Sequence, residues 1–184
     1  SLFGGTVFAD GGWTRGVGCL GASEDPVSTG QGPMSRYDKF NLNLNWSSDF
    51  MAGPLRARYA VAVGAQYSKD DLYYDSKFAI GDQSTVRGFK IRSAYGDSGV
   101  YISNTLSFPL LTSIGSVTPL VGVDWGAVGN KGETGNGGWI GGAAGGVRVS
   151  TKWANAAMTI GKPFRALPGM GYGVVWYLSA SVNY

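Results

Sequence analysis

The sequence contains no histidine, a single cysteine and no apolar run long enough to form a transmembrane helix. Without histidine, the chain lacks the side chain that most often serves as a general base or a metal ligand. Cys19 has no partner for an internal disulfide and no metal-binding spacing, so we expect it to be inert. A transmembrane helix would need about 20 mostly apolar residues in succession. The sequence therefore indicates no catalytic residues, no metal site and no cofactor.

Charged residues are also scarce, at 15% of the chain, whereas a soluble domain usually contains about 25%. The net charge is only +3 and the basic residues are scattered, whereas nucleic-acid binding needs a clustered basic face. We therefore expect no nucleic-acid partner.

The chain opens with SLFGG and shows no initiator methionine or signal-peptide pattern, so we expect a processed product or a piece of something longer.

What the sequence does contain is a series of alternating segments. Residues 40–46 (FNLNLNW) alternate large apolar side chains with asparagine, which is typical of a strand with one apolar and one polar face. No segment has a helical period. We therefore predict an all-β chain of about eight antiparallel strands. Similar or weaker alternation covers residues 2–17, 55–68, 100–108, 117–126, 138–150, 154–163 and 173–184.

The composition of the two faces favours a transmembrane β-barrel over a soluble sandwich or a lipocalin-like barrel. A soluble barrel packs large apolar side chains inside, but here the face opposite the apolar one is mostly glycine, serine, asparagine and threonine. That face suits a water-filled lumen. The strands are roughly ten to fourteen residues long, more than the five or six of an average strand and enough to cross a membrane. We therefore expect lipid to be a partner.

Long and short connections alternate along the chain. Bacterial outer-membrane barrels combine long extracellular loops with short periplasmic turns, so the alternation predicts an outer-membrane location with a periplasmic C-terminus. Tyr184 closes the last alternating segment and resembles the signal by which the barrel assembly machinery recognises its substrates; an ordinary edge aromatic is the alternative. The long connections fall near 18–34, 69–98, 128–137 and 164–172, and the short ones near 49–53, 109–115 and 151–153.

Two motifs stand in tandem in and after the longest loop, 69–98. The first motif, STVRGF, contains Val86, Arg87, Gly88 and Phe89, and the second, GDSGVYISNTL, contains Gly96, Asp97, Gly99, Tyr101 and Asn104. Together they resemble the two-partner secretion transporters (the TpsB family), which export haemolysins, haemagglutinins and contact-dependent-inhibition toxins and belong to the BamA-like superfamily of outer-membrane barrels. The chain departs from the family pattern at Thr105, where a glutamate is usual.

The resemblance implies that residues 1–184 form the C-terminal part of a sixteen-stranded barrel, strands 9 to 16, without the first eight strands, the plug or the POTRA domains. It also implies that loop 69–98 folds into the lumen and places Arg87 against an acid at the position of Asp124. The alternation of residues 117–127 independently puts Asp124 on the polar face. A guanidinium and a carboxylate can form two parallel hydrogen bonds, and Gly88 would permit a tight turn beside them.

The function implied is a translocation pore for one large unfolded exoprotein (TpsA-type), driven by folding of that exoprotein outside the cell. A BamA-type insertase and a simple diffusion porin are the alternatives, and a barrel enzyme is disfavoured because histidine is absent. The sequence pattern alone favours an exposed loop charge for Arg87, and the tandem motif favours the lumenal pair. Three further arginines, Arg56, Arg58 and Arg148, face the lumen by parity, either as conduit lining or as a solvated wall. Whether the chain closes alone, dimerises or pairs with the missing half stays open.

Overall fold

The computed structural model describes residues 4–17, 32–33, 35–90, 93–132 and 137–183. Within these ranges almost all regular structure is β-strand, and the one helical element is a single 3-10 turn, η1. No described helix has the length and apolarity needed to cross a membrane. The elements are β1 (Thr6–Arg15), β2 (Asp38–Ala52), β3 (Leu55–Ser68), η1 (Tyr74–Ser76), β4 (Phe78–Ile80), β5 (Ala94–Gly96), β6 (Ser98–Ser107), β7 (Leu110–Thr112), β8 (Gly115–Gly129), β9 (Gly138–Thr151), β10 (Ala154–Arg165) and β11 (Val175–Val182).

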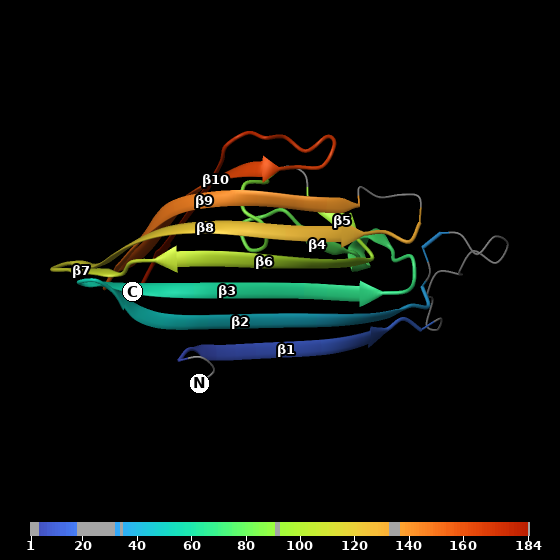
Figure 1. Ribbon diagram of the computed structural model, residues 1–184, viewed down its shortest axis with the longest axis horizontal. Coiled ribbons are helices and arrows are strands. Elements are labelled where there is room, and N and C mark those ends of the chain that lie inside the picture. Colours follow the sequence, from blue (N-terminus) through green and yellow to red (C-terminus); the bar gives the residue numbers. More distant parts are fainter. Residues whose placement is uncertain (1–3, 18–31, 34, 91–92, 133–136, 184) are drawn as a thin grey trace.

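The eight long strands cross one sheet in chain order, β1-β2-β3-β6-β8-β9-β10-β11, and every neighbouring pair is antiparallel (Figure 1). Such a meander needs only hairpin connections, which the chain supplies as tight turns at one end of the sheet and longer loops at the other. Short β7 pairs with the start of β8, while β4 and β5 form a separate hairpin. The predicted all-β antiparallel fold is confirmed.

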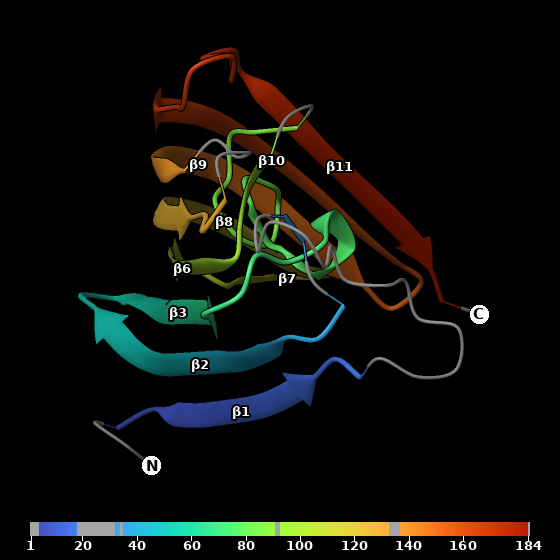
Figure 2. The ribbon, with the colours of Figure 1, turned by 90° about the vertical axis from the view of Figure 1, so that its right-hand side faces the viewer.

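The two faces of the sheet differ in polarity, as β8 shows. Val121, Val123 and Trp125 are 53%, 38% and 45% exposed on one face, whereas Asp124 is fully buried on the other. The sheet is strongly curved, and the loop between β3 and β6 lies on its concave side (Figure 2). Because the loop covers Asp124, the polar face is the concave one, and the exposed apolar row faces outward as in a membrane-spanning strand.

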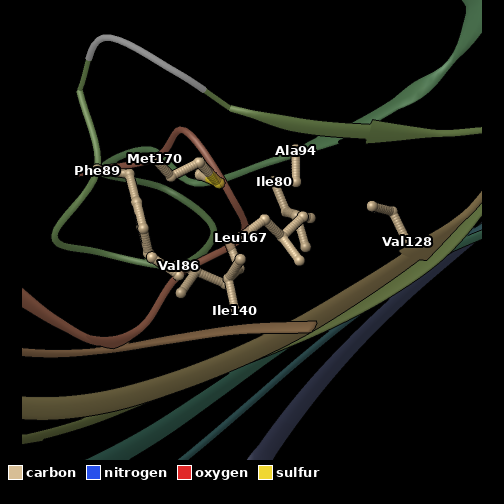
Figure 3. Packing of buried hydrophobic residues seen from close by; sticks show 9 residues of the cluster. Ile80, Val86, Phe89, Ala94, Val128, Ile140, Leu167 and Met170 are labelled. Carbon is tan, nitrogen blue, oxygen red and sulfur yellow. The ribbon is translucent and has the colours of Figure 1, made fainter. Parts of the chain in front are cut away.

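The apolar core of the described residues lies between this loop and the concave face of the sheet (Figure 3). Burying one large apolar side chain contributes about 1.5–3 kcal/mol, so the apolar contacts stabilise the loop in this position. The core therefore supports the loop rather than joining two sheets. It consists of Ile80, Val86, Phe89 and Ala94 from the loop, Val128 and Ile140 from β8 and β9, and Ala166, Leu167 and Met170 from the β10–β11 connection.

Candidate functional site

The loop between β3 and β6 leaves one end of the sheet, turns back along the concave face and returns to the same end (Figure 2). Sequence analysis treats residues 69–98 as one loop, and the structure adds η1 and the β4–β5 hairpin inside it. Residues 86–89 form its tip. Two buried polar groups hold the loop: a tip site, centred on Arg87 and Asp124, and a root cluster, made of Asp71, Lys77, Asp97 and Asn130.

In the tip site, Arg87 reaches from the loop to Asp124 in β8. Its Nε donates to Oδ2 of Asp124 and its Nη2 donates to Oδ1, both at 2.7 Å. These are the two parallel hydrogen bonds of a bidentate pair. The Arg87 and Asp124 side chains are 8% and 0% exposed, and Nη2 also donates to the backbone carbonyl of Asn104 at 2.8 Å. The pair therefore fixes the orientation of the tip as well as its distance from the wall.

The Asp124 carboxylate is fully supplied with donors. Besides the guanidinium, it accepts the backbone N–H of Arg87 at 3.0 Å, the backbone N–H of Asn104 at 3.1 Å and the hydroxyl of Ser103 at 2.9 Å. Two donors thus come from β6 and three from the arginine. Leaving one member of a buried ion pair without its partner costs about 3–5 kcal/mol, so the seated tip is strongly preferred while this region is dry.

Three glycines on neighbouring strands make room for the tip. A Cβ atom at Gly122 in β8 would collide with the Arg87 guanidinium, and one at Gly142 in β9 would collide with the Arg87 carbonyl oxygen. At Gly161 in β10 a Cβ would lie 2.6 Å from the backbone nitrogen of Gly88. Gly88 itself has a φ of 112°, a conformation that side-chain-bearing residues rarely adopt. We call the three wall residues Gly122, Gly142 and Gly161 the glycine cradle.

The residues on either side of Arg87 and Gly88 anchor the tip by other means. Val86 and Phe89 are 0% and 3% exposed and belong to the apolar core (Figure 3). From β11, the Tyr177 hydroxyl donates to the Phe89 carbonyl at 2.7 Å and accepts the Gly88 N–H at 3.1 Å. Each residue of the VRGF motif therefore has its own contact with the wall.

The root cluster holds the place where the loop leaves and rejoins the sheet. Asp97, which is fully buried, accepts the backbone N–H groups of Leu72 at 2.8 Å and Lys131 at 2.7 Å. Lys77 Nζ lies 3.0 Å from carboxylate oxygens of both Asp97 and Asp71. Burial alone would lower the pKa of Lys77, but hydrogen bonds and charge from Asp97 and Asp71 outweigh it and raise that pKa. The ammonium therefore stays charged at neutral pH.

The second sequence motif packs around this root. A Cβ at Gly96 would lie 2.8 Å from the backbone of Gly129, and a Cβ at Gly99 would lie 2.5 Å from the Phe78 ring. The Tyr101 ring stacks on Phe78, with centroids 6.1 Å apart. Asn104 differs from these residues because its side chain bonds Val123 and Tyr59 on the outward-facing side. The backbone carbonyl and N–H of Asn104, rather than its side-chain amide, hydrogen-bond in the tip site.

The other predicted positions lie elsewhere. Arg58 forms two hydrogen bonds of 2.8 Å with Asp49 near the short turns, 9 residues away in sequence. Tyr184 and Cys19 lie outside the described residues. Sequence reasoning missed Ser103, Lys77 and Tyr177, and it did not assign the glycine cradle. Parity could have placed Tyr177 on the concave face, since its neighbours Trp176 and Leu178 are apolar and outward-facing.

Comparison with known proteins connects this architecture to a set of secretion proteins. The family model described as "Haemolysin secretion/activation protein ShlB/FhaC/HecB" matches residues 1–149. The hemolysin transporter protein HpmB of Proteus mirabilis is 35% identical over 129 residues, which cover 70% of this chain and 23% of that protein. The outer membrane transporter CdiB of Dickeya dadantii is 29% identical over 165 residues, 88% of this chain and 29% of that protein.

Solved structures show the same likeness in three dimensions. CdiB from Escherichia coli superposes with a TM-score of 0.85 at 25% identity, covering 100% of this chain and 34% of that one. CdiB from Acinetobacter baumannii has a TM-score of 0.74 at 21% identity, over 81% of this chain and 28% of that one, and shares the fold. The chain thus spans about a quarter to a third of the length of these relatives.

Proposed function

Because this chain belongs to the haemolysin secretion/activation family described as ShlB/FhaC/HecB, we propose that it forms part of the wall of an outer-membrane secretion barrel. Its eight long strands would be strands 9 to 16 of a sixteen-stranded barrel, inserted by the barrel assembly machinery. The exposed apolar face would contact lipid and the concave face would line the lumen. We refer below to the whole barrel protein containing this chain as the complete transporter.

The cargo of the complete transporter would be one large unfolded exoprotein of the TpsA type. Relatives named as hemolysin transporters and as outer membrane transporters support this reading over a BamA-type insertase or a diffusion porin. The outer membrane offers no ATP, so the free energy for transport would come from folding of the exoprotein outside the cell.

The observation that carries the proposal is the buried Arg87–Asp124 pair, since it fixes the tip of a long loop inside the curve of the wall. A loop in this position narrows the lumen in one defined arrangement. Binding of the exoprotein can favour a second arrangement only to the extent that it binds that arrangement more tightly. The ion pair would therefore keep the loop at one defined place on the wall, so that the lumen can pass from a resting to a transporting arrangement and back.

Replacing Arg87 with alanine in the complete transporter tests this role. The variant should assemble in the outer membrane, because β8 and its neighbours keep their backbone pairing. Secretion should fall about tenfold or more, since each charge-assisted hydrogen bond lost corresponds to about 1.5–3 kcal/mol and the unanchored loop would obstruct the lumen. The measurement is exoprotein in the medium, normalised to transporter in the outer membrane.

Lys90→Ala is the matched control, because it removes an exposed cation 3 residues from Arg87 in the same loop. Lys90→Ala should secrete at the wild-type level. Wild-type secretion by Arg87→Ala would disprove the role of the ion pair. Loss of the Arg87→Ala protein from the outer membrane would also contradict it, because the pair would then serve assembly rather than transport.

A further inference from the structure

Tyr177 lies on β11 with its ring toward the loop, although its two neighbours face the opposite way. Trp176 and Leu178 are 53% and 73% exposed on the outward face. Tyr177 pairs in register with Thr159, a buried residue of β10 on the concave face. Tyr177 is therefore a polar-tipped aromatic on the face where the loop tip rests.

Among the described residues, the hydroxyl of Tyr177 hydrogen-bonds the backbone of the tip and no other group. It accepts the Gly88 N–H at 3.1 Å and donates its own proton to the Phe89 carbonyl at 2.7 Å. One hydroxyl has one proton to give and lone pairs to accept with, so the two bonds are compatible in a single orientation. Because both partners are backbone groups of adjacent residues, the hydroxyl recognises the position of the tip and not the identity of a side chain.

The place of β11 in the sheet gives this contact a consequence. Tyr177 lies on β11, whereas Asp124 lies on β8, three strands away in the order β8-β9-β10-β11. Among the described residues no other β11 side chain hydrogen-bonds the loop. The tip thus joins two strands of the wall that are not neighbours.

From this arrangement we propose that Tyr177 is a positioning residue that couples the seating of the loop tip to the conformation of β11. When the tip leaves Asp124, β11 loses its hydrogen bonds on the concave side; when β11 shifts, the tip loses two bonds and its seat weakens. Coupling between two such equilibria is reciprocal by thermodynamic necessity. The inference deepens the proposed function and rests on it for its meaning in secretion, but its test does not need secretion.

The test is Tyr177→Phe in the complete transporter, with Tyr67→Phe as the matched control. Phenylalanine retains the ring and removes only the hydroxyl, and Tyr67 is half-exposed on the outward face. Nitroxide labels at Gln83 and Leu111, in a Cys19→Ser background, would report the loop position by pulsed electron paramagnetic resonance. A second pair, at Val174 and Leu111, would report the start of β11. Leu111 is suitable as the reference because it is 89% exposed in the short hairpin.

Tyr177→Phe should raise the ratio of released to seated loop about two- to tenfold, the change expected from losing ordinary hydrogen bonds. It should also broaden the Val174–Leu111 distances. Arg87→Ala should broaden that second distribution as well, although residue 87 does not touch β11 through its side chain. Adding Tyr177→Phe to Arg87→Ala should change it little further, because the tip would already have left the hydroxyl.

Two results would overturn the proposal. One is a Tyr177→Phe loop distribution no different from that of Tyr67→Phe. The other is a distribution of Val174–Leu111 distances that Arg87→Ala leaves unchanged. That result would mean that the tyrosine packs at the tip without coupling the tip to β11. Both distances are measured without exoprotein, so these failures are distinct from a failure of the secretion proposal, which the Arg87→Ala secretion assay detects by itself.

Discussion

The tip site and the root cluster each bury a carboxylate with no exposed area, yet they are built differently. At the tip, the acid Asp124 is on the wall and a single arginine comes from the loop. At the root, the acid Asp97 joins the returning chain to Leu72 and Lys131, and a lysine shared with Asp71 completes the group. The tip thus joins one planar guanidinium to one acid that also accepts backbone and hydroxyl donors, whereas the root joins one lysine to two acids, one of which also accepts backbone donors.

The difference indicates which contact can open. If the tip is released, Arg87 and Asp124 both meet water in the space that the loop leaves, so the desolvation of the pair is recovered. The root differs, because Asp97 is held by the backbone N–H groups of Leu72 and Lys131 as well as by Lys77, so releasing it would break contacts with three separate segments. We therefore interpret the root as a permanent attachment and the tip as a contact that can be broken and remade.

The largest effect on stability is expected for Asp97→Asn. Asparagine keeps the shape but loses the charge and one acceptor, so Lys77 and a backbone N–H are left buried without a full partner. Breaking a buried pair in this way costs about 3–5 kcal/mol. The melting temperature of the detergent-purified transporter should fall, and protease should cut the loop more readily. Asp75→Asn, at an exposed carboxylate of η1, is the control.

Asp124→Asn sharpens the same comparison. It should release the tip but change the melting temperature far less than Asp97→Asn, because the separated tip is hydrated. Equal losses of melting temperature in the two variants would show that tip and root are equivalent structural ties, and the distinction drawn here would be wrong.

An intermediate effect is expected for Gly142→Ala, which fills the glycine cradle without touching a charge. The new methyl group would collide with the Arg87 carbonyl oxygen, and overpacking of this kind typically costs about 1–3 kcal/mol. The ratio of seated to released loop should fall about 5- to 150-fold by the Gln83–Leu111 distance.

Gly145→Ala is the matched control for the cradle, three positions along β9 and on its other face. There the nearest atom to an added Cβ is the Leu120 carbonyl oxygen, at 3.9 Å. This control should leave the loop seated. If Gly142→Ala also leaves the loop seated, the wall adapts to the tip and the cradle does not select its position.

The sheet could be predicted from the sequence because its signal is local. The alternation of apolar and polar side chains along a strand such as β8 predicts which side chains share a face. The outward exposure of Val121 and Trp125 follows from it. The same parity put Asp124 on the polar face, where the structure has it buried. The motif resemblance was still needed to bring Arg87 to that residue, because nothing local relates positions 37 residues apart.

The remainder of the site depends on how the loop lies across several strands. Gly122, Gly142 and Gly161 are ordinary strand glycines in the sequence, and only the position of the tip reveals why a side chain is excluded at each. Lys77 and Asp97 are 20 positions apart, in a loop whose β4–β5 hairpin is too short for a periodic signal. Such contacts are set by packing and not by pattern.

The smallest effect is expected at the turn that leads into the tip, and it depends on pH. Oδ1 of Asp82 accepts the N–H groups of Ser84 at 2.7 Å and Thr85 at 2.8 Å, and also both of their hydroxyls. Burial alone would raise the pKa of Asp82, but these hydrogen bonds outweigh it and lower that pKa. A depressed folded-state pKa means that the turn is stabilised above the unfolded value, about 3.9.

That stabilisation should disappear as the pH falls below about 4 and through the lower folded-state pKa, because protonation weakens the acceptor. A nitroxide at Gln83, an exposed position of this turn, should therefore become roughly two- to tenfold more mobile between pH 6 and pH 3. In Asp82→Asn it should be mobile at pH 6 already and respond little to acid, while a label at Leu111 should report no change in either protein. If the Gln83 label is equally ordered at both pH values, the turn does not contribute to holding the tip. The tip would then be held by Arg87, Tyr177 and the apolar core.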